Sequence, residues 1–204
     1  IAVINYGVDA DFFSPNGTTP EWMRSLRPYI LFMGPFESRR HHLECLEAVS
    51  MLRKKGLAEE NLVFAGERNE YCLRLDARAC ELGLKITWTG YGPREELPDF
   101  YRGARLFVHP VTHAFGLSVL EAMACGAPVV SSTDPGSGIP ETVGDGALLA
   151  EATDPADIAR AMRQALGSEA ARAALAERGL KRAREMSWRR AAQATLEVYK
   201  KAVR

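Results

Sequence analysis

The stretch RLFVHPVTHAFGLSVLEAMACGAPVVSS, residues 105–132, decides the fold class. It opens with the short apolar run RLFVHP and closes with a second run of the same kind, APVVSS. Between the two runs, LSVLEAMAC has the length and composition of a helix that follows a glycine-containing turn. A strand, a helix and a second strand in this order predict a right-handed βαβ unit in a parallel sheet.

The same alternation continues on both sides of this stretch. We predict strands in six apolar runs: YILFMG (29–34), NLVFAG (61–66), KITWTG (85–90), RLFVHP (105–110), APVVSS (127–132) and GALLA (146–150). Their nearly continuous hydrophobicity is typical of strands that are covered on both faces. A helix is predicted over 41–56, where apolar residues recur every three positions and Gly56 can form the C-cap. The chain is therefore predicted to be α/β, with a doubly wound, Rossmann-like parallel sheet.

The two ends of the chain depart from this alternation. Residues 1–20 show one short strand followed by Asn, Gly, Thr and Pro, which indicates a connecting segment. After residue 154 the chain becomes helical, and residues 187–204 begin with a Ser N-cap and carry an apolar stripe. We predict an interdomain linker over 1–20, a Rossmann-like domain over 21–186 and a C-terminal helix over 187–204.

The composition is that of an ordinary globular domain, with 47% hydrophobic and 25% charged residues. Lys and Arg balance Asp and Glu at 26 each, so net charge gives no reason to expect binding to nucleic acid. The four cysteines have no zinc spacing, and we expect reduced, buried thiols in a cytosolic protein. No apolar run approaches the roughly 18 residues that span a bilayer. Because the chain starts at Ile1 rather than Met, we expect a fragment.

A candidate binding site follows the strand at 105–110, because ligands of open parallel sheets bind beyond the carboxyl ends of the strands. Gly116 lets the backbone approach a ligand closely, and the free N–H groups of Leu117 and Ser118 are expected to point outward from the helix start. Such a terminus suits an anion, for example a diphosphate. An ordinary βα turn has the same sequence features.

Charged residues add to this candidate site. Glu121 lies about one turn into the helix, where its carboxylate can accept hydrogen bonds from vicinal hydroxyls such as those of a ribose. Taken alone, it is more typical of a solvated glutamate in the first turn of a helix. Arg39 and Arg40 stand at the opening of another helix, where cations oppose the helix dipole unless an anion is held there. A solvated basic turn is the alternative.

Six stretches together resemble the C-terminal, donor-binding domain of GT-B-fold glycosyltransferases of the retaining family 4, also called group 1. They occur in the family's order and cover nearly the whole chain: NYGVDADFFSP, ILFMGPFESRR, TGYGPREELPDFYRGARLFVHP, FGLSVLEAMACGAPVVSS, GIPETVGDGALL and RGLKRAREMSW. The resemblance implies transfer of a hexosyl group from a nucleoside diphosphate sugar, UDP- or GDP-linked, with retention of configuration. It implies neither a metal nor another cofactor.

The resemblance also implies roles for individual residues. Glu121 matches the second Glu of the family's E-x7-E motif, which holds the ribose. Arg40, next to Arg39, stands where the family has a diphosphate-binding Lys. The other residues that the match assigns to the donor site are Gly34, Gly66, Glu67, Gly90, Tyr91, Phe115, Gly116, Leu117 and Ser118.

Several positions differ from the family pattern. His113 stands where the first Glu of the E-x7-E motif is expected, so we predict it, together with Arg40, as a catalytic residue beside the donor sugar. A neutral histidine can bond hydroxyls but supplies no negative charge. Pro35 replaces an Arg that supports the diphosphate, and it also removes a backbone N–H. His41 replaces a Gly, and GERN at 66–69 replaces a turn richer in glycine.

Other signals favour no site. Asp9 and Asp11 spell a D-x-D pattern, but they lie in the connecting segment, and we expect no metal there. His109, at a strand end, is expected to be structural, and Trp88 is expected in the core. The basic residues around 181–190 fit a solvated helix face, or a peripheral contact with the inner face of a membrane.

Two functions of different classes remain open. The first is the donor domain of a hexosyltransferase that assembles a polysaccharide, glycolipid or other glycoconjugate. That enzyme needs an N-terminal domain for the acceptor, and this chain alone would be inactive. The second is a catalytically degenerate nucleotide-binding or scaffold module, which His113 and Pro35 suggest.

Overall fold

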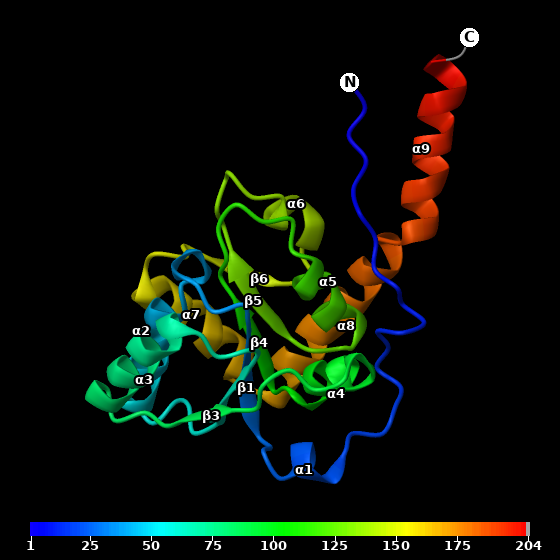
Figure 1. Cartoon of the computed structure of the whole chain (residues 1–204). Helices are drawn as coiled ribbons and strands as arrows, with labels where there is room; N and C mark the ends of the chain where they lie inside the picture. The colour runs from blue at the N-terminus through cyan, green and yellow to red at the C-terminus, as the bar shows by residue number, and fades with distance from the viewer. Residues whose placement is uncertain (203–204) are drawn as a thin grey trace.

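The computed structural model describes residues 1–202 and contains a six-stranded parallel sheet (Figure 1). The strands are Tyr29–Met33 (β1), Asn61–Ala65 (β2), Ile86–Trp88 (β3), Leu106–His109 (β4), Val129–Ser132 (β5) and Leu148–Ala150 (β6). Their order across the sheet is β3-β2-β1-β4-β5-β6, and every neighbouring pair is parallel. Each of the six predicted runs contains a strand, and the predicted doubly wound sheet is confirmed.

Helices cover both faces of this sheet. They are Glu21–Arg24 (α1), His42–Arg53 (α2), Glu70–Glu81 (α3), Leu97–Gly103 (α4), Leu117–Ala124 (α5), Ile139–Val143 (α6), Pro155–Leu166 (α7), Glu169–Glu185 (α8) and Trp188–Ala202 (α9), with 3-10 turns at Ser38–Arg40 (η1) and Arg94–Glu96 (η2). On one face α2 packs against α3 and α7, and on the other α5 packs against α4, α6 and α8 (Figure 1).

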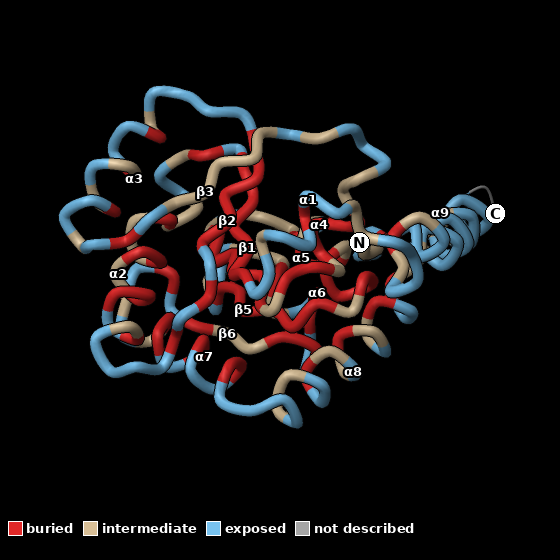
Figure 2. The backbone as a smooth tube through the Cα atoms, turned by 90° about the horizontal axis from the view of Figure 1, so that it is seen from below, coloured by how far each residue is buried: buried red, intermediate tan, exposed pale blue. Residues whose placement is uncertain are grey.

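The central strand β1 shows why the apolar runs are continuous. All five of its residues are buried, and alternate side chains enter opposite cores. Ile30 and Phe32 contribute to the core beneath α2, α3 and α7, whereas Leu31 and Met33 contribute to the core beneath α4, α5 and α8. Figure 2 shows the resulting buried centre, with exposed backbone confined to its outer helices and loops.

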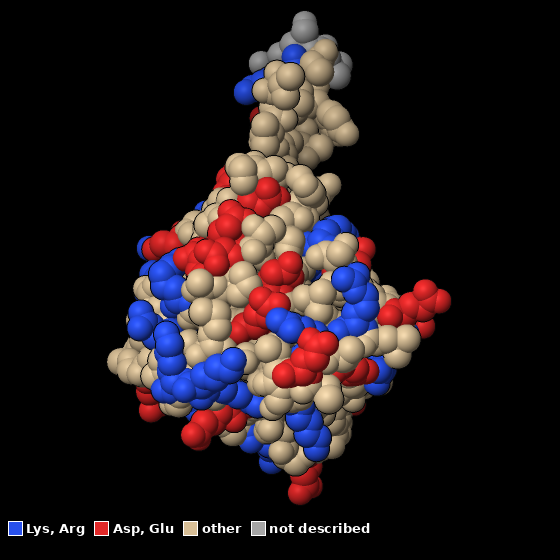
Figure 3. Space-filling view, turned by 90° about the vertical axis from the view of Figure 1, so that its left-hand side faces the viewer, with Lys and Arg blue, Asp and Glu red and all other residues tan. Residues whose placement is uncertain are grey.

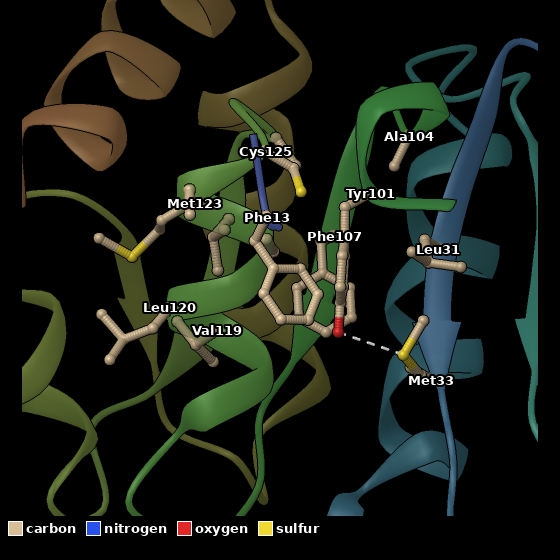
Figure 4. Packing of buried hydrophobic residues seen from close by; sticks show 14 of the residues in the cluster. Phe13, Leu31, Met33, Tyr101, Ala104, Phe107, Val119, Leu120, Met123 and Cys125 are labelled. Atoms are coloured by element: carbon tan, nitrogen blue, oxygen red, sulfur yellow. Dashed lines mark hydrogen bonds between the residues drawn. The ribbon is translucent and has the colours of Figure 1, made fainter. Parts of the chain in front are cut away.

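The core on the α4–α5 side is built around Tyr101. Its ring packs edge-on against Phe107 of β4, with 5.3 Å between the ring centroids, and lies 6.2 Å from Phe13 (Figure 4). Its hydroxyl lies 3.2 Å from the Met33 sulfur, which brings α4 into contact with the end of β1. Because Phe13 is also buried here, the N-terminal segment is anchored to the domain.

The N-terminal segment contacts the junction between α8 and α9. The prediction of a strand within residues 1–20 is wrong, because this segment forms only an isolated bridge between Val8 and Ser187. The predicted Ser N-cap is present, since Ser187 Oγ accepts the N–H of Arg190 at 3.3 Å. From there α9 projects away from the body beside the N-terminus and buries none of its described residues (Figures 1 and 2). Its first residue, Trp188, packs on Tyr6 of the N-terminal segment, with 5.7 Å between the ring centroids.

Three smaller expectations are corrected. Residues 181–190 are split between α8 and α9, so their basic side chains do not share one helix face. Cys80 of α3 is exposed, although the other three thiols are buried and all four are free. Trp88 is only partly buried, and its Nε1 donates to Asp76 Oδ1 at 2.8 Å.

The surface shows no dominance of one charge on the face drawn in Figure 3, where acidic and basic side chains are interspersed. Within residues 1–202, no helix is both long and apolar enough to cross a membrane.

Candidate functional site

The candidate site lies where the sheet reverses its winding direction. β1 and β4 are neighbours, but the chain after β1 enters α2 on one face and the chain after β4 enters α5 on the other. Their loops therefore diverge and open a crevice at the carboxyl ends of the strands. A backbone hydrogen bond ties the two loops together, from Thr112 N to Arg39 O at 3.1 Å.

A cavity of about 330 Å³ occupies this crevice. It is lined by Met33, Gly34, Ala65, Gly90, Tyr91, Gly92, Pro93, Arg94, Leu97, Phe100, Tyr101, Ser118 and Glu121. The lining thus comes from the ends of β1 and β2, the loop after β3, and helices α4 and α5. The cavity is mostly apolar with a few polar groups, which is the usual composition of a small-molecule site.

Glu121 is the acidic group of this cavity. Tyr101 Oη donates to its Oε2 at 3.0 Å, which holds the carboxylate against the cavity wall. Burial raises the pKa of Glu121, while the Tyr101 hydrogen bond and nearby Arg94 lower it. Burial also raises the pKa of Tyr101, so its hydroxyl stays a donor. The remaining lone pairs of the carboxylate can accept from a ligand's hydroxyl groups.

The N-terminus of α5 presents free backbone donors. Gly116 precedes the helix with φ +95°, and a Cβ there would lie 3.0 Å from Ile139 Cγ1, so a glycine is required. The N–H groups of Val119 and Leu120 bond to Gly116 O at 3.0 Å each. Among residues 1–202, the N–H groups of Leu117 and Ser118 have no acceptor, and no side chain caps the helix. This terminus can bind an anion.

The two arginines after β1 have different environments. Arg39 is 46% exposed in its side chain, and its Nη2 lies 2.7 Å from Glu37 Oε1. Arg40 is 13% exposed; its Nη1 lies 3.0 Å from His109 Nε2 and its Nε lies 3.4 Å from the same Glu37 oxygen. Burial lowers the pKa of Arg40, although a guanidinium stays charged in proteins. Arg40 is therefore the inward-facing cation of this loop.

The glycines after the first three strands pack closely. Gly66 N donates to Gly90 O at 3.0 Å, and a Cβ at Gly66 would lie 3.1 Å from Gly34 Cα. Gly34 and Gly90 line the cavity together with Tyr91, whose pKa is raised by burial. Glu67 is exposed and does not line the cavity.

His113 lies apart from the cavity. Its side chain is 76% exposed, and its backbone has φ +52°, a conformation that costs a non-glycine residue energy. Its N–H donates to Asp134 Oδ2 at 2.7 Å, and Asp134 Oδ1 accepts from Gly136 N at 3.0 Å. These backbone hydrogen bonds lower the pKa of Asp134. His113 Nδ1 lies 3.9 Å from that carboxylate.

Five of the predicted site residues line the cavity: Gly34, Gly90, Tyr91, Ser118 and Glu121. The remaining ones do not line it, and they lie on the turns after β1, β2 and β4 and at the start of α5: Arg39, Arg40, Gly66, Glu67, His113, Phe115, Gly116 and Leu117. Sequence reasoning missed Tyr101, which only the packing of α4 brings to Glu121. It also missed Asp134, although its position two residues after β5 could have drawn attention to it.

The acidic pattern near the N-terminus has a structural explanation. Asp9 Oδ1 accepts the N–H groups of Asp11 and Phe12 at 3.2 Å each, so it caps a turn. Within residues 1–202, no three His, Cys, Asp or Glu side chains are grouped as metal ligands.

Comparison with known proteins assigns the family. The profile described as Glycosyl transferases group 1 matches residues 23–182. The chain belongs to this family. O-antigen chain mannosyltransferase B of Escherichia coli is 35% identical to this group 1 chain over 176 residues, 84% of the chain and 45% of that protein. D-inositol 3-phosphate glycosyltransferase of Corynebacterium jeikeium is 31% identical over 215 residues, 98% of the chain and 51% of that protein.

Solved structures of glycosyltransferases share the fold of this group 1 chain. A glycosyltransferase from Rickettsia africae has a TM-score of 0.83 at 20% identity, covering 100% of this chain and 57% of that one. HepE of Anabaena, in complex with UDP-glucose, has a TM-score of 0.79 at 17% identity, covering 99% and 57%. The group 1 chain spans about half the length of these relatives. Its fold is one Rossmann-like half of a GT-B fold, as predicted.

Proposed function

We propose that this chain is the donor domain of a group 1 glycosyltransferase, which binds a nucleoside diphosphate sugar and supports transfer of its hexosyl group with retention. The carrying observation is the cavity at the sheet's switch point, where Glu121, fixed by Tyr101, lies one turn from the free N–H groups of α5. A carboxylate for hydroxyl groups beside donors for an anion matches the ribose and diphosphate of such a donor.

The proposed binding mode assigns one part of the ligand to each part of the site. The base occupies the apolar part of the cavity near Gly90 and Tyr91. The ribose hydroxyls donate to Glu121. The diphosphate meets the N–H groups of Leu117 and Ser118, with Arg40 as its cationic partner.

Charge stabilisation is the chemistry that these groups can supply. When the glycosidic bond to the diphosphate breaks, the leaving nucleoside diphosphate gains negative charge. The α5 N–H groups and Arg40 are already oriented, so they stabilise this charge without reorganising. The acceptor, whose hydroxyl attacks the sugar, is bound by a second domain, and closure of the two domains excludes water from the reaction.

The relatives support a sugar nucleotide as donor. HepE of Anabaena is described in complex with UDP-glucose, and the Escherichia coli relative is named a mannosyltransferase. We therefore favour a UDP- or GDP-linked hexose and an acceptor on a growing glycan, lipid or other glycoconjugate, without a metal or other cofactor.

Isothermal titration calorimetry tests the proposal. The chain is titrated with UDP, GDP and ADP, and then with the corresponding nucleoside diphosphate sugars. We expect one nucleoside diphosphate to bind clearly more tightly than the others, and no sugar transfer by the 204 residues alone. Robust transfer by this chain without a second domain would contradict the proposed need for an acceptor domain.

A second function is favoured by one observation. His113 stands on an exposed loop where the family pattern has a sugar-facing Glu, so the chain can instead be a degenerate nucleotide-binding or scaffold module. Absence of binding to every nucleotide would support the scaffold. Substituting His113→Glu in the complete transferase separates the other cases: a gain in transfer indicates a lost catalytic group, and a fall indicates a site adapted to histidine.

A further inference from the structure

His109 is a buried histidine behind the proposed diphosphate site. It is the last residue of β4, 4% exposed, and its ring stacks on Phe107 with 5.4 Å between centroids and 17° between planes. Its carbonyl oxygen accepts from Ser131 Oγ at 2.8 Å and from Val111 N at 2.9 Å. The strand, the stack and these hydrogen bonds hold the ring in place.

The contact between His109 and Arg40 determines the tautomer of the imidazole. The guanidinium of Arg40 has only donors, so His109 Nε2, at 3.0 Å from Arg40 Nη1, must be the unprotonated nitrogen that accepts. The ring proton therefore lies on Nδ1, which is buried and has no hydrogen-bond partner within residues 1–202. The ring is neutral, because burial and the neighbouring Arg40 lower the pKa of His109 well below its ordinary value.

Arg40 has few other restraints. It follows β1 on the 3-10 turn η1. Within the described part of the chain, the only carboxylate in contact with its guanidinium is that of Glu37, whose Oε1 lies 3.4 Å from Arg40 Nε. Glu37 is shared with the more exposed Arg39, which it meets at the shorter distance of 2.7 Å. The neutral acceptor from β4 is thus the closer and more buried of the two partners of Arg40.

We infer that His109 is a positioning residue for the donor diphosphate: its Nε2 holds the Arg40 guanidinium in the crevice between the β1 and β4 loops. This inference rests on the proposed donor-binding function. A neutral acceptor suits the role, because it orients the cation and leaves its charge for the phosphates, whereas a carboxylate would neutralise it. The uncompensated Nδ1 proton is the cost of this arrangement.

Four variants of the intact chain test the inference: His109→Phe, His109→Gln, Arg40→Ala and the double variant His109→Phe/Arg40→Ala. Phe keeps the packing on Phe107 but removes the acceptor, and Gln restores an acceptor oxygen at a similar reach. Calorimetry is performed with whichever of UDP, GDP or ADP binds best and with its parent nucleoside, and circular dichroism verifies folding.

We expect His109→Phe to weaken nucleoside diphosphate binding about fivefold to tenfold and nucleoside binding less than about twofold, since only the phosphate partner is displaced. His109→Gln should recover diphosphate affinity to within about twofold, and His109→Phe should add no loss when Arg40 is already Ala. Failure of the unmodified chain to bind any nucleotide would remove the proposed function itself.

Other results would overturn the inference and leave the proposed function standing. They are a loss below about twofold in His109→Phe while Arg40→Ala weakens binding, an equal loss for nucleoside and diphosphate, no recovery in His109→Gln, or additive losses in the double variant. Unaltered diphosphate binding in Arg40→Ala would also overturn it.

Discussion

Glu121 and His113, which mark the two ends of the E-x7-E spacing, have opposite environments. Glu121 lines the cavity, is held by the buried Tyr101, and has its pKa raised by burial. His113 has a 76% exposed side chain, and its closest contact with Asp134 is the backbone hydrogen bond at 2.7 Å. The proposed nucleotide side of the site is therefore preorganised by the core, whereas the proposed sugar-facing side is a surface loop whose side chain can change at little structural cost.

Truncating the side chain of Glu121 or of His113 should give the largest expected difference in nucleotide affinity. Glu121→Ala should weaken binding of the preferred nucleoside diphosphate about a hundredfold, about 2.7 kcal/mol, because two hydroxyl hydrogen bonds to a charged group are lost. His113→Ala should change it less than about twofold. Calorimetry measures the affinity of both variants. The 2′-deoxy form of the same nucleoside diphosphate is the control ligand, because it lacks one of the two ribose hydroxyls. Equal losses in the two variants would remove the distinction.

Acid should destabilise the protein through its buried histidines. Burial lowers the pKa of His42 to about 3, from its ordinary 6.5. The folded state keeps His42 neutral, whereas the unfolded state binds a proton below pH 6.5. The free energy of unfolding is therefore at its full value above pH 6.5 and decreases as the pH falls toward 3, by up to about 1.4 kcal/mol per pH unit. Urea unfolding should therefore show a loss of about 2 kcal/mol between pH 6.5 and pH 5 from this one group.

Two variants separate the buried histidine from the exposed one. His42→Phe keeps an aromatic ring against Phe36 and Phe64, 5.2 and 5.8 Å away, and should reduce the acid loss. His113→Ala should leave the acid loss unchanged, because its side chain is 76% exposed and its replacement removes no buried group. An acid loss that persists in His42→Phe would assign it to other groups, such as His109.

Backbone substitutions test the two positive-φ residues of the same loop. Gly116→Ala should destabilise the domain by about 1–3 kcal/mol, because φ +95° disfavours a side chain and Ile139 leaves little space for it. His113→Gly should change stability by less than about 1 kcal/mol, as relief of the strained φ is offset by greater freedom of the unfolded chain. Thermal unfolding of both variants measures the difference, and equal losses would show that the His113 backbone is also tightly held.

The sequence predicted the local elements of this protein well. Each apolar run became a strand because a sheet covered on both faces needs continuous hydrophobicity, and this property is readable residue by residue. Gly116 and Glu121 could also be picked out from the sequence, because a glycine before a helix and an acidic residue one turn later are recognised from their spacing along the chain. The resemblance of six stretches to group 1 glycosyltransferases was confirmed by the family profile, which matches residues 23–182.

Tertiary structure decided which side chains meet. Tyr101 and Glu121 belong to different helices, and they come together only because α4 and α5 pack on the same face of the sheet. Neighbouring Arg39 and Arg40 look equivalent in sequence, yet only Arg40 reaches His109, because β1 and β4 are adjacent strands separated by a long stretch of chain. Local propensity and hydrophobicity determine the elements, whereas contacts between distant side chains depend on the strand order, which no single segment contains.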